Sequence, residues 1–180
     1  LQNVDLIRSA DVQMRELSNR TRETIHLGAL DEDGIVYIHK IDAMYNLRMY
    51  SRIGRRNPLH STAIGKVLLA WRDRDEVAQI LSQIEFTLST EHTLTSAAEL
   101  LPVLERVREQ GYGEDAEEQE GGILCIAVPV FDRFGVAIAG LSISFPTLRF
   151  SEAGREVYVA LFHVAARRIS EQQGYHDYPF

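Results

Sequence analysis

Apolar and polar residues alternate along several stretches of the chain, which is the period expected of strands that bury one face. Two pairs of these stretches are joined by short turns, Asp31-Glu-Asp-Gly34 and Asp132-Arg-Phe-Gly135. Short turns of this kind indicate antiparallel hairpins. The stretches predicted as strands are 24–30, 35–41, 47–53, 122–131 and 136–145.

Other stretches repeat apolar residues at helical spacing. Ser96 and Glu99 form a capping box before a helix that stops at Gly111, and Ser151 opens the last helix. Helices that separate strand hairpins favour an α+β class with a mainly antiparallel sheet. The predicted helices are 4–22 (with Val4, Ile7, Met14 and Leu17 near one face), 61–71, 73–84, 96–111 and 151–172.

Composition and charge exclude several classes of protein. At 180 residues, with 45% hydrophobic and 25% charged residues, the chain can form one soluble domain with a sizeable core. The formal net charge of −7 argues against nucleic-acid binding by this chain itself, because phosphate backbones require a basic surface. A single cysteine excludes an internal disulfide and is typical of the cytoplasm. No apolar run reaches the roughly 20 residues that span a bilayer, so no membrane partner is expected.

Two charged clusters are interpreted as surface features. Arginines at 48, 52, 55 and 56 could contact nucleic acid, but with this net charge a salt-bridged surface or a subunit contact is the better interpretation. The acidic run 114–120 is typical of a solvated loop.

A group of polar residues in the apolar C-terminal half is the strongest sign of a binding site. Ser142 and Ser144 are two apart on a predicted strand, so both hydroxyls point to the same face. Buried hydroxyls need hydrogen-bond partners, and a small oxygen-rich ligand could provide them. Asp115 and Cys125 complete the group, although a lone cysteine in an apolar strand is usually only a small buried hydrophobe.

The start of the predicted helix 61–71 is a second candidate. The first amides of a helix lack intrahelical partners and carry a partial positive charge, which suits a carboxylate or phosphate. Small residues Ser61, Thr62 and Ala63 would let a ligand approach, and His60 could add a hydrogen bond or a charge. The alternative is that Ser61 or Thr62 only caps the helix.

Catalysis and metal binding find little support. No sequence signature links Cys125 to a histidine, so nucleophilic catalysis is not expected, and no metal site is predicted because His and Cys residues do not stand at short ligand spacing. No glycine-rich phosphate motif is present, and no cofactor is expected.

Four segments, in this order and spacing, resemble the C-terminal effector-binding domain of IclR-type transcriptional regulators. They are His60-Ser-Thr-Ala-Ile-Gly-Lys66, Gly111-Tyr-Gly-Glu-Asp-Ala-Glu-Glu118, Cys125-Ile-Ala-Val-Pro-Val130 and Gly140-Leu-Ser-Ile-Ser144. Segments 25–33, 45–56 and 174–180 add a likeness to the branch of this family that represses the catabolism of the keto sugar acid 2-keto-3-deoxygluconate.

The resemblance implies a GAF-like fold, a curved antiparallel sheet flanked by helices, and assembly as a homodimer or homotetramer. It implies that 1–22 is a connector helix, that 23–180 is the effector-binding domain, and that operator DNA is bound only through a winged helix-turn-helix domain absent from this sequence. A helix packed on the domain's own core is an equally good interpretation of the first segment.

The resemblance also implies a set of ligand contacts. Ala63 and Ile64 match the backbone site that receives the carboxylate or keto end of a small acid. The residues Asp115, Cys125, Ser142 and Ser144 match the polar contacts, and Asn46 and Met49 match a loop that closes the pocket. Because Asn46 is polar where other members are apolar, a hydroxylated ligand is favoured. The expected function is sensing of a keto sugar acid that releases operator DNA. The alternatives are an enzyme with Cys125 as nucleophile, or a dimerisation module without a ligand.

Overall fold

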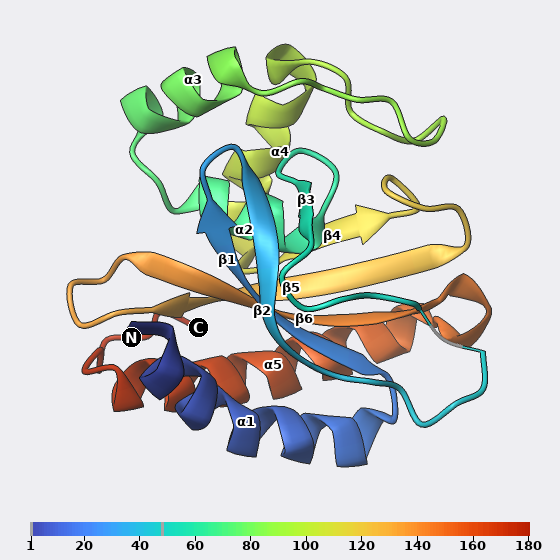
Figure 1. Cartoon of the computed structure of the whole chain (residues 1–180), viewed down its shortest axis with the longest axis vertical. Helices are drawn as coiled ribbons and strands as arrows, with labels where there is room; N and C mark the ends of the chain where they lie inside the picture. The colour runs from blue at the N-terminus through green and yellow to red at the C-terminus, as the bar shows by residue number, and fades with distance from the viewer. Residues whose placement is uncertain (1, 48) are drawn as a thin grey trace.

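A curled antiparallel sheet forms the centre of the molecule in a computed structural model, which describes residues 2–47 and 49–180 (Figure 1). Within these residues the sheet has six strands in the order β3-β2-β1-β6-β5-β4, and every strand pair is antiparallel. The strands are β1 (Thr24–Asp31), β2 (Gly34–Ile41), β3 (Arg56–Pro58), β4 (Gly113–Ala116), β5 (Ile123–Phe131) and β6 (Ala137–Pro146).

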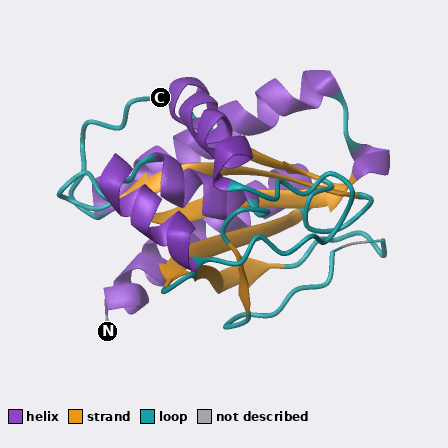
Figure 2. Ribbon diagram, turned by 90° about the horizontal axis from the view of Figure 1, so that it is seen from above, coloured by secondary structure: helices purple, strands orange, loops and turns teal. Residues whose placement is uncertain are grey.

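Helices cover both faces of the sheet (Figures 1 and 2). The first and last helices lie side by side below it in Figure 1, and the remaining helices lie above it. The helices are α1 (Gln2–Thr21), α2 (Ala63–Ala70), α3 (Arg74–Gln83), α4 (Ala97–Gln110) and α5 (Glu152–Gln172). The α+β class with an antiparallel sheet flanked by helices, as expected from the sequence, is confirmed.

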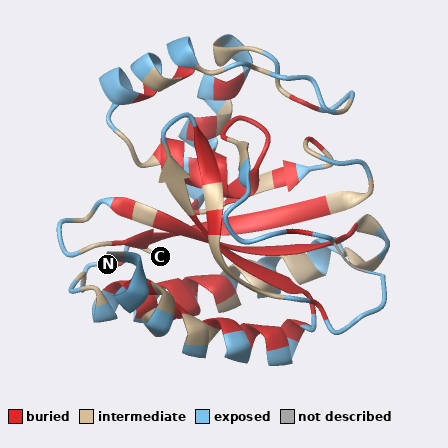
Figure 3. Cartoon of the chain, viewed as in Figure 1, coloured by how far each residue is buried: buried red, intermediate tan, exposed pale blue. Residues whose placement is uncertain are grey.

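The alternation of side chains divides the interior into two cores, one on each face. Leu141 and Ile143 of β6 point into the core that α1 and α5 cover, together with Ile126 of β5. The opposite face carries the core built around α2 and α4. Figure 3 shows the sheet buried on both faces and α1 buried mainly on its inner side. Ser142 and Ser144 therefore lie on the α2 face, because they alternate with Leu141 and Ile143.

Two paired glycines let the N-terminal end of α2 sit close to the sheet. Gly28 of β1 is paired with Gly140 of β6. A Cβ on Gly140 would lie 2.9 Å from Cγ2 of Ile64, and one on Gly28 would lie 3.0 Å from its Cδ1. Ile64 of the first turn of α2 thus packs where larger residues would hold the helix away, and the helix start reaches the neighbourhood of the serines.

Most helix ends agree with the predictions. The side chain of Ser96 caps α4 by accepting a hydrogen bond from the backbone N–H of Glu99 (3.2 Å), and α4 ends at Gly111 in a left-handed conformation. Ser151 caps α5. The buried face of α1 is shifted from the predicted one: Leu6 and Ala10 join Met14 and Leu17 in the core, while Val4 is 53% exposed.

The predicted strand 47–53 is wrong. Its described residues form a loop, and the strand that pairs with β2 comes later, as β3. Side chains rather than a backbone ladder hold this loop: Nζ of Lys40 donates to the Ser51 carbonyl (2.6 Å), and the Ser51 hydroxyl is 2.7 Å from Nε2 of His26. Met49 lines a cavity and Ser51 is buried, whereas Leu47, Tyr50 and Ile53 are exposed, so the apolar residues of this segment do not share one buried face.

The two charged clusters have different outcomes. Arg56 forms ion pairs with Asp31 and Asp33, both at 2.9 Å, which agrees with a salt-bridged surface, while position 48 of the same cluster lies outside the described residues. The acidic run is not simply a solvated loop, because Asp115 and Glu118 are buried.

Among the described helices none is long and apolar enough to cross a membrane.

Candidate ligand-binding site

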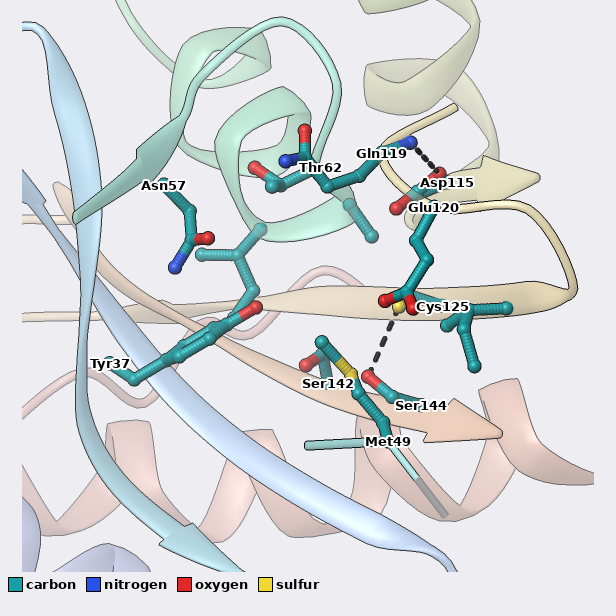
Figure 4. Close-up of a pocket in the computed structure, with 13 residues that line it drawn as sticks. Tyr37, Met49, Asn57, Thr62, Asp115, Gln119, Glu120, Cys125, Ser142 and Ser144 are labelled. Atoms are coloured by element: carbon teal, nitrogen blue, oxygen red, sulfur yellow. Dashed lines mark hydrogen bonds between the residues drawn. The ribbon is translucent and has the colours of Figure 1, made fainter. Parts of the chain in front are cut away.

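A small cavity lies between the start of α2 and the sheet face that carries the two serines (Figure 4). Its volume is about 30 Å³, which is room for roughly two water molecules. Side chains reach it from strands, from the loop before β3 and from the loop between β4 and β5. The lining residues are Tyr37, Met49, Asn57, Thr62, Ala63, Ile64, Asp115, Gln119, Glu120, Ile123, Cys125, Ser142 and Ser144.

Hydroxyl and thiol groups form the floor of the cavity. Ser144 lies directly opposite Cys125 in the β5–β6 ladder, and its Oγ is 3.1 Å from the Cys125 Sγ. Burial raises the pKa of the Cys125 thiol, which therefore stays protonated at neutral pH. Ser142 is 3% exposed and lines the cavity, and its hydroxyl makes no side-chain hydrogen bond within residues 2–47 and 49–180. This hydroxyl is available to a bound molecule.

The start of α2 brings hydrogen-bond donors to one side of the cavity. Thr62 is the N-cap: its Oγ1 accepts from the Gly65 amide (3.1 Å) and donates to the Pro58 carbonyl (2.6 Å). The amides of Ala63 and Ile64 belong to the first helical turn, where no intrahelical acceptor exists. The favourable end of the helix dipole therefore faces the cavity lining.

Tyr37 and Asn57 lie across the cavity from the acidic loop, and Thr62 at the start of α2 lies between them (Figure 4). The ring of Tyr37 stacks on His26, with centroids 4.0 Å apart and planes 15° apart. Burial raises the pKa of Tyr37, so its hydroxyl remains a donor, and burial lowers the pKa of His26 to about 3, so its ring is neutral. The stacked neutral ring fixes Tyr37 without adding charge.

Two carboxyl groups lie on the opposite side, from Asp115 and Glu120. Oδ1 of Asp115 accepts from the backbone amides of Glu118 (2.7 Å) and Gln119 (3.2 Å). Burial raises the pKa of Asp115 to about 7, more than these two bonds lower it. Near neutral pH this carboxyl can therefore donate as well as accept.

The loop after β4 is held by a buried ion pair. Nζ of Lys66 donates to both carboxylate oxygens of Glu118 (2.5 and 2.6 Å) and to the Glu114 carbonyl (2.7 Å). The hydroxyl of Thr93 donates to the Glu118 carbonyl (2.6 Å). The burial of Glu118, which sequence reasoning assigned to a solvated loop, follows from the cation that α2 supplies.

The structure brings most of the sequence-predicted site residues to this cavity and leaves three outside its lining. Those that line it are Met49, Thr62, Ala63, Ile64, Asp115, Cys125, Ser142 and Ser144. The others make different contacts: the His60 ring packs on Phe86 and donates from Nε2 to the Thr87 carbonyl (3.1 Å), and Asn46 is exposed. The Ser61 hydroxyl donates to Oε1 of Gln119 (2.5 Å), so Ser61 reaches the cavity only through its partner.

Five lining residues were missed by sequence reasoning: Tyr37, Asn57, Gln119, Glu120 and Ile123. A signal existed for Tyr37, because it alternates with Ile35 on the inner face of β2. For Asn57 and Glu120 no periodic pattern was available, since one lies in a strand of three residues and the other in a loop.

The polar groups of the site can hold a small molecule through hydrogen bonds. Within residues 2–47 and 49–180 no cluster of His, Cys, Asp and Glu is arranged to hold a metal ion. In the same residues no histidine hydrogen-bonds to the Cys125 thiol, whose partner is a serine. The cavity combines donors at one side, carboxyl groups at the other and hydroxyls below, which suits a small polar acid.

Comparisons with known proteins identify the family of the chain. Residues 1–171 match the family described as bacterial transcriptional regulator IclR C-terminal. The chain is 79% identical over 180 residues to the HTH-type transcriptional regulator KdgR of Escherichia coli, of which it spans 68%. It is equally similar, at 79%, to KdgR of Dickeya chrysanthemi, of which it spans 59%.

Solved structures give the same result. The crystal structure of the C-terminal domain of E. coli KdgR superimposes with a TM-score of 0.89 at 74% identity, covering 95% of this chain and 99% of that one. Thermotoga maritima IclR superimposes with a TM-score of 0.91 at 36% identity, covering 94% of this chain and 69% of that one. The chain therefore belongs to the IclR family of bacterial transcriptional regulators, as an effector-binding domain homologous to that of KdgR.

Proposed function

We propose that this domain senses a keto sugar acid such as 2-keto-3-deoxygluconate, and that binding makes a cytoplasmic repressor release its operator. The observation that carries the proposal is the one-sided distribution of polar groups around the cavity. Tyr37 and Asn57 lie on one side, the carboxyl groups of Asp115 and Glu120 lie on the other, and the donors at the start of α2 lie between them. A molecule with an acid at one end and hydroxyls at the other matches this polarity.

In this proposal the carboxylate of the ligand lies at the start of α2 and at Ser142. Amides of Ala63 and Ile64 and the hydroxyl of Ser142 would donate to its oxygens, as the helix dipole favours. The hydroxyls of the ligand would donate to the carboxyl groups opposite. None of these residues is required to form or break a covalent bond.

The cavity must enlarge to accept such a ligand. Pockets that bind small molecules usually measure about 300–1,000 Å³, and this one measures about 30 Å³. Met49 is the lining residue best suited to move, because its side chain is unbranched and flexible and its loop pairs with no strand. The proposal therefore includes a shift of Met49 on binding.

Binding changes regulation only if the ligand prefers one arrangement of the subunits. A ligand with equal affinity for both arrangements shifts neither population. We propose that the domain assembles as a homodimer or homotetramer, that α1 connects it to a helix-turn-helix domain, and that the favoured arrangement misplaces the DNA-binding domains.

Calorimetric titration of the chain with 2-keto-3-deoxygluconate tests the proposal, with pyruvate and glyoxylate for comparison. We expect selective binding of the sugar acid and an unchanged ligand spectrum by NMR. Binding of the two short acids alone would refute the sugar-acid assignment. Conversion of the ligand, abolished by Cys125→Ala, would instead favour an enzyme.

The double variant Ser142→Ala with Ser144→Ala tests the site itself. Loss of both hydroxyls is expected to weaken binding at least about tenfold, since the hydrogen bond from Ser142 to a charged group contributes about 1.5–3 kcal/mol. Ser82→Ala, which removes an exposed hydroxyl of α3, is the control and is expected to bind normally. Melting temperatures establish that both variants fold, and unchanged affinity in the double variant would contradict the assignment.

A further inference from the structure

We infer that Glu120 determines which acids the site accepts, favouring an acid with a neutral hydroxylated tail over one whose tail carries a second negative charge. This inference rests on the proposed function, in which the first carboxylate lies at the start of α2. It concerns the opposite side of the cavity, where the tail of the ligand would lie.

Glu120 extends from the loop between β4 and β5 toward the floor of the cavity (Figure 4). Its charge is felt there, because it contributes to raising the pKa of the buried Cys125 thiol. In Figure 4 its carboxylate lies on the side of Asp115, away from Tyr37 and Asn57. A ligand that has its acid at the start of α2 would direct its other end toward Glu120.

Glu120 differs from its acidic neighbours because its carboxylate has no hydrogen-bond or ion-pair partner among the described residues. Oε1 of Glu117 accepts from the Gly122 amide (2.8 Å), Glu118 is paired with Lys66, and Asp115 accepts from two amides. The side chain of Glu120 makes no hydrogen bond or ion pair with the part of the chain that the structure describes, and the residue is exposed. Its hydrogen-bonding capacity is therefore available to a ligand.

No described lining residue is an arginine or lysine that could offset a second anion. Lys66 of α2 cannot take this role, because its ammonium group already donates to both carboxylate oxygens of Glu118. An acid with a single carboxylate meets the donors of α2 and Ser142. A second carboxylate or a phosphate at the far end would instead meet Glu120, and like charges in a partly enclosed site repel strongly.

Hydroxyl groups, in contrast, suit this carboxylate. An ionised carboxylate accepts hydrogen bonds through both oxygens, and bonds to a charged acceptor are about twice as strong as neutral ones. Adjacent hydroxyls of a sugar-acid tail could donate to the two oxygens of Glu120. The same side chain thus attracts a neutral polyhydroxy tail and repels an anionic one.

The test compares 2-keto-3-deoxygluconate with the equally long acid that carries a carboxylate in place of the terminal CH₂OH. The variants are Glu120→Gln and, as control, Glu91→Gln, which removes an acid from an exposed side chain of another loop. In low salt the unchanged chain is expected to prefer the mono-acid at least about tenfold. Glu120→Gln is expected to reduce this preference to about threefold or less, mainly by improving binding of the di-acid, while Glu91→Gln leaves it unchanged.

The outcomes separate this inference from the proposed function. If the unchanged chain binds the mono-acid and Glu120→Gln leaves the preference as it was, the role of Glu120 is refuted and the sensing function stands. If the unchanged chain binds neither acid, both are refuted. A further check is ionic strength, since the preference of the unchanged chain must fall as salt screens the repulsion.

Discussion

Replacing Lys66 with methionine is expected to destabilise the domain by about 3–5 kcal/mol, the range found when one partner of a buried ion pair is removed. The ammonium group is buried, with 3% of the Lys66 side chain and 10% of the Glu118 side chain exposed. Methionine keeps the length of the side chain but leaves the Glu118 carboxylate with one donor among the described residues, the Ala116 amide at 3.3 Å. The cost therefore arises from an uncompensated buried charge rather than from a packing defect.

For a domain of 180 residues this corresponds to a fall in melting temperature of about 6–20 °C, at about 2–4 °C per kcal/mol. The double variant Lys66→Met with Glu118→Gln should be more stable than Lys66→Met alone, because the stranded charge is gone. Calorimetry or urea unfolding of the four proteins in this cycle gives the coupling energy, expected to be about 2 kcal/mol or more.

Arg15→Met is the matched control, since it breaks an ion pair with Asp11 in which the Arg15 side chain is 67% exposed. It is expected to change stability by less than about 1 kcal/mol, as exposed pairs do. If Lys66→Met costs no more than this control, and the double variant equals the sum of the single ones, the buried pair does not hold the loop.

Two further predictions concern packing and protonation. A Cβ on Gly65 would lie 2.2 Å from the Leu59 carbonyl oxygen, so Gly65→Ala should destabilise the domain by about 1–3 kcal/mol, although alanine is favoured over glycine in helices by about 1 kcal/mol. The control Gly121→Ala, whose Cβ would have no heavy atom within 4 Å, should change the midpoint of urea unfolding little. A Gly65→Ala variant more stable than the unchanged chain would contradict the close approach. The pKa of Asp115 is raised by burial from 3.8 to about 7, so the folded state holds a proton that the unfolded chain releases, and stability should fall by up to about 4 kcal/mol as pH rises through that window. Asp115→Asn, which still accepts from the two amides, should remove that part of the decline between pH 4 and 7 in urea unfolding, and an unchanged pH profile would refute it.

The local patterns of the sequence predicted the elements that depend on neighbouring residues. Hairpins β1–β2 and β5–β6 follow from alternation and short turns, and the ends of α4 and α5 follow from Ser96 and Ser151. Alternation in the sequence led to the strand prediction at 47–53, yet it does not establish burial, since Leu47 and Ile53 are exposed. It does not show whether a neighbouring strand is present to accept the backbone hydrogen bonds.

Part of the site could be predicted from the sequence, because it too depends on the periodicity of single elements. Ser142 and Ser144 share a face because they are two apart on a strand, and the start of α2 offers unpaired amides wherever it lies. Tyr37, Asn57 and Glu120 come from elements far apart in the chain, and no local rule places them around one cavity. Their association depends on the strand order β3-β2-β1-β6-β5-β4.

By itself the sequence determined the α+β class, the hairpins, most helix ends and the residue types that can bind an acid, because these depend on periodicity and on interactions within a few residues. Only the tertiary structure decided that Lys66 pairs with the buried Glu118, that Gly28 and Gly140 bring α2 down onto the sheet, and that Glu120, beside the cavity, has no partner among the described residues. The physical reason is that burial and charge pairing are set by contacts between residues distant in the chain. Such contacts exist only once the layers have packed.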